Sequence, residues 1–126
     1  MKENATKTTL VLGASDNPER TSHTALHMLT EAGVPVLAVG LKEAEVAGVK
    51  IKKGTDWLAG QQIHTVTLYM NAQRQKDFHD FILQLHPKRI IFNPGAENPE
   101  LYQAATAKGI ECHNACTLVM LNFGQF

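Results

Sequence analysis

The sequence has little of several features that would define a function class at once. Only two cysteines, Cys112 and Cys116, occur in 126 residues, and their spacing fits neither a disulfide scaffold nor a zinc ribbon. Twelve basic and twelve acidic residues cancel, so no charge footprint indicates nucleic acid or an anionic membrane surface. The apolar runs are too short to span a bilayer, and the polar N-terminus lacks the apolar core of a signal peptide. We therefore expect a cytoplasmic protein with no nucleic-acid or membrane partner, in which local groups bind any anion.

What is present is an alternation of apolar runs and amphipathic stretches, which predicts an α/β fold on a parallel sheet. Strands are expected at 9–12, 36–39, 63–70, 90–92 and 110–113, with a weak edge strand at 49–52. Right-handed crossovers favour a doubly wound sheet of five or six strands in the order 3-2-1-4-5, with the sixth strand at 49–52. The length predicts a single domain over residues 1–126, with 1–7 as a flexible N-terminus.

The helices are predicted from apolar residues at helical spacing and from their caps. One helix is expected over roughly 22–32 and one after Asn71, with Asn71 as its N-cap. A third is expected to begin at Pro99, with Asn98 as its N-cap. Asparagine is a favoured N-cap and proline is favoured in the first helical turn. The tail, 116–126, is expected to form a short helix or a strap that covers an edge.

The stretch LVLGASDNPERTSHTALHML, residues 10–29, has the pattern of a strand, a turn and a helix. It lacks the second and third glycines of the fingerprint G-x-G-x-x-G. Gly13 allows a sharp turn, and Ala14 and Ser15 keep the turn slim enough for backbone N–H groups to face a ligand. The helix start at Ser22 offers free N–H groups, and Arg20 offers a planar partner for the same anion. The stretch is typical of a phosphate site, or alternatively of an ordinary turn with a surface arginine.

The end of the second strand discriminates between nucleotides. NAD enzymes usually have an acidic residue there, about 20 residues past the glycine loop, that binds the ribose hydroxyls. This chain has Gly40 and Leu41 at the tip, followed by Lys42, and its first acidic residue is Glu43. A cation suits an additional ribose phosphate, as in coenzyme A or NADP, better than a bare diol.

These residues resemble the stand-alone coenzyme A-binding domain family, Rossmann-like proteins similar to the nucleotide-binding domain of the succinyl-coenzyme A synthetase α subunit. The matching pieces are GASDNPERTS (13–22), AVGLK (38–42), EVAGVKI (45–51), HTVTLYM (64–70), GAENPE (95–100) and HNAC (113–116). The family commonly has an Asn-Pro pair in place of Gly40 and Leu41, and aromatic or apolar residues in place of Asn71.

The resemblance implies a Rossmann-like sheet with helices on both faces and coenzyme A, a small-molecule nucleotide ligand, across the carboxyl ends of the strands. It places the diphosphate near Gly13, Ala14, Ser15, Arg20 and Ser22. It places the adenosine end near Gly40, Leu41 and Lys42, with Asn71, Asn114 and Cys116 facing the same crevice.

The predicted function is therefore non-catalytic binding of coenzyme A or an acyl-coenzyme A. The alternatives are an NADP-dependent enzyme, an acyl-transfer enzyme that uses Cys116, or a scaffold or regulatory protein that has lost the ligand. His23 and His27 lie four residues apart and have a spacing that metal ligands use, but a solvated helix face is the simpler interpretation. No catalytic residue and no metal site is predicted.

Overall fold

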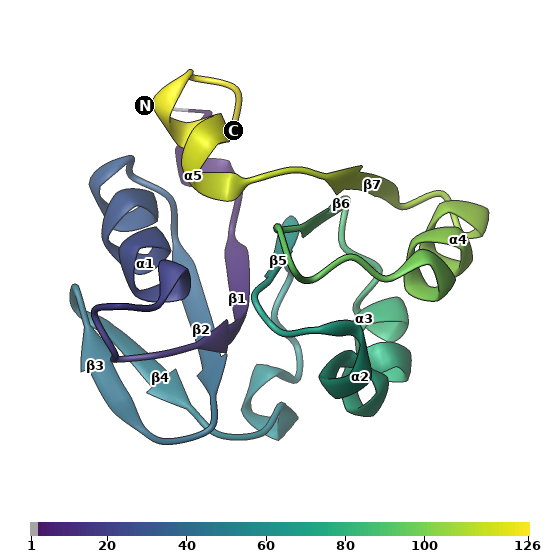
Figure 1. Cartoon of the computed structure of the whole chain (residues 1–126), viewed down its shortest axis with the longest axis horizontal. Coiled ribbons are helices and arrows are strands. Elements are labelled where there is room, and N and C mark those ends of the chain that lie inside the picture. Colours follow the sequence, from purple (N-terminus) through teal and green to yellow (C-terminus); the bar gives the residue numbers. More distant parts are fainter. Residues whose placement is uncertain (1–2) are drawn as a thin grey trace.

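A seven-stranded sheet with the order β3-β4-β2-β1-β5-β6-β7 lies at the centre of the computed structural model, which describes residues 3–126 (Figure 1). Neighbouring strands are parallel except β3 and β4, which are antiparallel. The chain winds outward from β1 to one side and then crosses to β5 on the other, so the winding reverses between β1 and β5. The strands are β1 (Thr9–Ala14), β2 (Val36–Gly40), β3 (Ala44–Val46), β4 (Val49–Lys52), β5 (Thr65–Leu68), β6 (Arg89–Phe92) and β7 (Glu111–Asn114).

The prediction of five or six strands is wrong, because β3 is a seventh. It has only three residues and pairs with β4 through a two-residue turn. Both turn residues, Ala47 and Gly48, have positive φ, which is the backbone of a tight hairpin turn. The segment 49–52 is therefore not an edge strand, since β3 lies outside it. The predicted order 3-2-1-4-5 is wrong for the five main strands, which stand in the order 2-1-3-4-5, because the strand predicted at 63–70 (β5) pairs with β1 and the segment 49–52 (β4) lies beside β2. With 49–52 counted as the third of six strands, the order is 3-2-1-4-5-6.

The helices form where caps and apolar spacing predict them, with one interruption. The region after Asn71 breaks into α2, η3 and α3 instead of one helix, and His86, with φ of 48°, ends it. The Asn71 side chain accepts a hydrogen bond from the Arg74 amide, and Asn98 accepts one from the Leu101 amide. The helices are α1 (Thr21–Glu31), α2 (Ala72–Gln75), α3 (His79–Leu85), α4 (Pro99–Ala107) and α5 (Thr117–Asn122), with 3-10 turns η1 (Asn4–Thr6), η2 (Asp56–Leu58) and η3 (Lys76–Phe78).

The hydrophobic core consists of two clusters, one on each face of the sheet. Val11 packs with Leu26 and Leu29 of α1 and with residues of α5 on one face. Leu10 and Leu12 point to the other face, where the side chains of η2, α3 and α4 cover them. Because successive strand residues point to opposite faces, β1 contributes to both clusters. Helices therefore lie on both faces, as the sequence predicts, with α1 and α5 apart from α3 and α4 (Figure 1).

The two ends of the chain meet at the amino end of the sheet. In the region expected to be flexible, residues 1–2 lie outside the described residues, and Asn4–Thr6 form η1. Lys7 Nζ donates a hydrogen bond to the Phe126 carbonyl oxygen at 2.9 Å. The expected short helix forms as α5, and the tail after it returns to this end of the sheet, where Phe126 contacts Lys7 and Arg89 of the inner strand β6 and does not cover an edge strand. Among residues 3–126, no helix has the length and apolar character needed to cross a membrane.

Candidate anion-binding site

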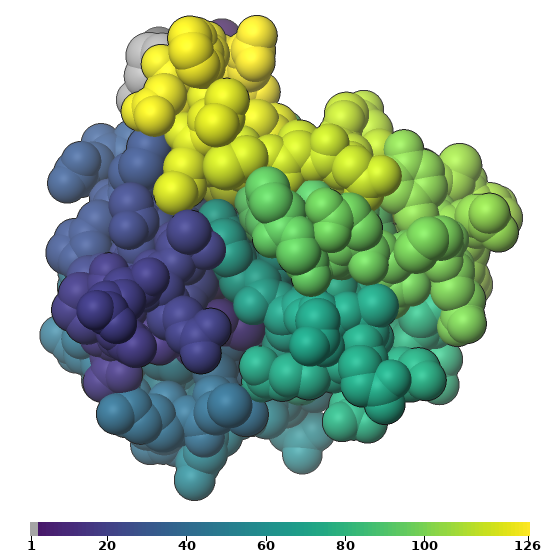
Figure 2. Space-filling model, viewed as in Figure 1, coloured from purple at the N-terminus to yellow at the C-terminus, as the bar shows by residue number. Residues whose placement is uncertain are grey.

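A cavity of about 280 Å³ opens at the carboxyl ends of β1, β2 and β5, at the predicted crevice. In the space-filling view, the hollow lies where the purple segment after β1, the blue segment after β2 and the teal start of α2 meet (Figure 2). The structure brings together most of the residues predicted for the ligand. Those that line the cavity are Gly13, Ala14, Ser15, Arg20, Ser22, Leu41 and Lys42.

The remaining predicted residues lie elsewhere. Gly40 lines an adjacent cavity, also about 280 Å³, that shares Gly13, Leu41 and Arg74 with the first. Asn71 is exposed and caps α2. Asn114 lines a separate cavity of about 180 Å³ beside α4, and Cys116 is the N-cap of α5. Asn71, Asn114 and Cys116 are thus not among the residues that line the main cavity.

The turns at Gly13 and Gly40 in this crevice depend on glycine for backbone packing as well as for the approach of a ligand. Gly13 has φ of 98° and is the extra residue of a bulge between Leu12 and Ala14. A Cβ at Gly13 would lie 2.9 Å from the Tyr69 carbonyl group, and a Cβ at Gly40 would lie 2.4 Å from Ala14 O. These distances are below any real Cβ contact, so the strands can meet here only through glycine.

The start of α1 faces the cavity without a side-chain cap. Arg20 occupies the N-cap position in an extended conformation, and no acidic residue lies in the first turn. Thr21 and Ser22, the first two helical residues, line the cavity. Helix N-termini carry unsatisfied N–H groups and a partial positive charge. This end of α1 is therefore open to an anion.

The loop before α1 is held by its own polar side chains. Ser15 Oγ accepts a hydrogen bond from the Asn17 amide at 3.0 Å, and Asn17 Oδ1 accepts one from the Glu19 amide at 3.0 Å. The Arg20 amide donates to the Asn17 carbonyl oxygen, also at 3.0 Å. The loop therefore has a defined conformation without help from a ligand.

The cavity rim is predominantly cationic. Arg20, Lys42 and Arg74 line it, together with one carboxylate, that of Asp16. Lys42 Nζ lies 3.2 Å from Asp16 Oδ2. Within the described residues 3–126, neither arginine has an ion-pair partner. Two guanidinium groups therefore remain available to an anionic ligand.

Tyr69 forms part of the cavity wall and stays neutral at physiological pH. Its hydroxyl is buried and has no hydrogen-bond partner in the part of the chain that the structure describes. Burial raises the pKa of Tyr69 to about 12. The pKa increase excludes a tyrosinate at neutral pH.

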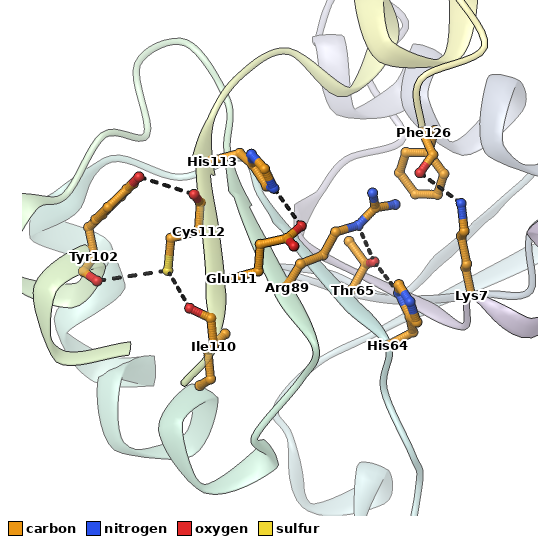
Figure 3. A network of polar contacts seen from close by, with 10 residues as sticks. All are labelled: Lys7, His64, Thr65, Arg89, Tyr102, Ile110, Glu111, Cys112, His113 and Phe126. Atoms are coloured by element: carbon orange, nitrogen blue, oxygen red, sulfur yellow. Dashed lines mark hydrogen bonds and ion pairs between the residues drawn. The ribbon is translucent and has the colours of Figure 1, made fainter. Parts of the chain in front are cut away.

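In the cysteine–histidine segment at 112–116, the Cys112 thiol lies beside carbonyl oxygens. Cys112 Sγ lies 3.6 Å from the Ile110 carbonyl oxygen and 3.8 Å from that of Tyr102 (Figure 3). Burial raises the pKa of the Cys112 thiol, so little thiolate forms. The imidazole of His113 instead pairs with Glu111, Nε2 to Oε2 at 2.6 Å.

The two histidines of α1 contact each other, with ring centroids 4.9 Å apart. No cluster of three or more metal-ligating side chains occurs among residues 3–126.

Sequence reasoning missed four residues of the cavity: Asp16, Thr21, Tyr69 and Arg74. Arg74 could have been predicted. It lies in the first helical turn after β5, and the loop after β5 borders the crevice. Asp16 and Thr21 lie inside the turn whose neighbours were predicted. Tyr69 had no such signal, since it continues the alternation of β5.

A mostly parallel sheet whose winding reverses beside a loop suited to anions defines a Rossmann-like fold. The sequence model of the coenzyme A binding domain family matches residues 7–122, and the chain therefore belongs to that family. No curated protein matches the sequence.

Solved structures have the same fold. An uncharacterised protein is 44% identical, with a TM-score of 0.89 over 98% of this chain and 100% of that one. A hypothetical protein from Pyrococcus horikoshii is 25% identical, with a TM-score of 0.82 over 97% of this chain and 87% of that one. A protein from Thermus thermophilus shares the fold, at 24% identity and a TM-score of 0.82 over 95% and 90% of the two chains.

Proposed function

We propose that this protein binds coenzyme A or an acyl-coenzyme A at the carboxyl ends of β1, β2 and β5 and catalyses no reaction itself. The observation that carries the proposal is the uncapped start of α1, which lines the cavity together with Arg20 and Arg74. A diphosphate needs several convergent donors, and backbone amides with bidentate guanidinium groups supply them. Membership of a coenzyme A binding family supports the same ligand.

The rest of the ligand would extend along the crevice. The diphosphate would lie against the turn at 13–15 and the amides of Thr21 and Ser22. The adjacent cavity has apolar walls from Val39, Met70 and Phe78, which suit the adenine ring. Lys42 would then meet a phosphate on the ribose.

The chemistry of the cavity favours binding over acyl transfer. Among the described residues, those that line it offer arginines, a lysine, hydroxyls and one carboxylate, and none of these lining residues is a cysteine or a histidine. Cys116, the nucleophile of the acyl-transfer alternative, is not among the lining residues. NADP is the second candidate ligand, because Lys42 would suit its ribose phosphate equally.

Isothermal titration of the full chain against coenzyme A, acetyl-coenzyme A, NADP and NAD tests the proposal. We expect binding of coenzyme A and weak or no binding of NAD. Tight NAD binding with no response to coenzyme A would overturn the proposal, and preference for NADP over coenzyme A would favour the second candidate.

Arg20→Ala should weaken coenzyme A binding about tenfold or more, since a charge-assisted hydrogen bond contributes about 1.5–3 kcal/mol. Lys50→Ala removes a charge from an exposed position on β4, outside both cavities, and serves as the matched control. Equal affinity of the two variants for coenzyme A would place the diphosphate elsewhere.

A further inference from the structure

Asp16 bridges the two loops that border the cavity. Its Oδ2 lies 3.2 Å from Lys42 Nζ, so the loop after β1 is joined to the loop after β2. The neighbouring polar side chains, Ser15 and Asn17, are occupied by amides of their own loop. Among residues 3–126, the Asp16 carboxylate has no partner except Lys42, so the pair can open without unfolding the loop.

The ion pair is exposed and easily exchanged. The side chains of Lys42 and Asp16 are 73% and 38% exposed. Exposed pairs gain little from Coulomb attraction, because water and salt screen them. A stronger anion can therefore displace the carboxylate from Lys42.

We propose that Asp16 competes with the ribose phosphate of the ligand for Lys42 and so reduces the preference of the site for ligands that carry this phosphate, an inference that rests on the coenzyme A-binding function proposed above. Without ligand, the Asp16 carboxylate occupies the Lys42 ammonium group. A phosphate monoester carries a charge of about −1.5 to −2 at pH 7 and displaces the single charge of Asp16. A bare ribose diol has no charge with which to do so, and it leaves the pair closed.

One consequence distinguishes this role from simple loop packing. Asp16 lowers the affinity only for ligands with a phosphate monoester on the ribose, because only they must break the pair.

The test compares coenzyme A with dephospho-coenzyme A, which differ only in the ribose phosphate. Isothermal titration at one fixed ionic strength is performed on the wild-type chain, Asp16→Asn and Glu19→Gln. Glu19 is an exposed carboxylate of the same loop that does not line the cavity. Glu19→Gln therefore removes one negative charge from this loop, as Asp16→Asn does, and serves as the control. Asp16→Asn should bind coenzyme A about two- to fivefold more tightly, the range that loss of an exposed pair produces. Its affinity for dephospho-coenzyme A, and both affinities of Glu19→Gln, should stay within about 1.5-fold of wild type.

A double-mutant cycle shows whether Asp16 acts through Lys42. In the Lys42→Met background, Asp16→Asn should change the logarithm of the coenzyme A affinity by less than half of the change that it causes in the wild-type background. Asp16→Glu keeps the carboxylate and should bind coenzyme A as the wild type does. Equal shifts for both ligands, or an undiminished gain without Lys42, would overturn the selectivity role while leaving the proposed function intact. Failure of the wild-type chain to bind either ligand would overturn the proposed function and the selectivity role with it.

Discussion

The two ends of the sheet both gather cations, but they use them in opposite ways. At the carboxyl end, Arg20, Lys42 and Arg74 are exposed around a cavity. At the amino end, Arg89 is only 8% exposed, and its guanidinium carbon lies 4.3 Å from the centroid of the Phe126 ring (Figure 3). Solvated cations beside a hollow are available to a ligand, whereas a buried arginine stacked on an aromatic ring serves packing. Position relative to water, more than residue type, separates a binding site from a core contact.

At the amino end, the buried guanidinium group of Arg89 has neutral partners. Arg89 Nε donates to Thr65 Oγ1 at 2.7 Å, and His64 Nδ1 lies 2.7 Å from the same hydroxyl oxygen. Arg89 forms no ion pair with any acidic residue of the described chain. Burial lowers the pKa of Arg89, although the shifted group stays protonated at neutral pH. The amino end is thus stabilised by packing and hydrogen bonds, and the carboxyl end by backbone geometry.

The largest expected effect tests that backbone geometry. Gly13→Ala should destabilise the fold by about 2–4 kcal/mol, because it adds a Cβ 2.9 Å from the Tyr69 backbone at a φ of 98°. Urea denaturation measures the change. Gly95 has a similar φ of 90° but nothing within 4 Å of a Cβ, so Gly95→Ala should cost only about 1 kcal/mol. Equal losses would show that the close approach between β1 and β5 contributes nothing.

The next effect concerns the amino end. Phe126→Ala should destabilise the fold by about 2–3 kcal/mol, because the buried ring covers Arg89. Phe123, also in the tail, is 72% exposed, and Phe123→Ala should change the unfolding free energy by at most about 0.5 kcal/mol. Coenzyme A affinity, measured by titration, should be the same for both variants. A selective loss of binding in Phe126→Ala would show that the two ends are coupled.

A smaller effect is expected at Tyr69, which lines the cavity at the carboxyl end. Its buried hydroxyl has no partner within residues 3–126, so Tyr69→Phe should leave stability unchanged or raise it by up to about 1 kcal/mol. The Tyr102 hydroxyl donates to the Cys112 carbonyl oxygen at 3.1 Å, so Tyr102→Phe should cost about 1 kcal/mol. Thermal or urea unfolding of Tyr69→Phe and Tyr102→Phe measures both changes in stability. A clear loss of stability in Tyr69→Phe would reveal a hydrogen bond to the Tyr69 hydroxyl.

The smallest effect is a pH dependence at the amino end. Burial first, and then the charge of Arg89, lowers the pKa of His64 below 6.5. The unfolded chain therefore binds a proton more readily, so His64 contributes stability above about pH 6.5 that is lost as the pH falls through the folded pKa. Urea midpoints at pH 7.5 and 5.5 should differ more in the wild type than in His64→Gln. The same pH dependence in both proteins would assign it to other groups.

Much of the fold could be predicted from local patterns, while part of the site could not. Asn71 and Asn98 cap helices as predicted, because a cap is a local hydrogen bond between a side chain and the amide three residues later. The strand β3 was missed, since three residues are too few to show alternation. The placement of Asn114 and Cys116 toward the crevice came from resemblance, and the structure puts one beside α4 and the other at the start of α5.

The sequence by itself determined the alternation of strands and helices, the two-faced sheet and the turn at 13–22, because periodicity, caps and glycine positions act over a few residues. Only the tertiary structure decided which charged groups share the cavity. Arg74 and Asp16 are 58 residues apart by their numbers, and parallel pairing of β1 with β5 brings their loops to one cavity. The ion pair between Asp16 and Lys42 likewise needs β1 beside β2. Contacts between loops depend on strand order and register, which no local pattern encodes.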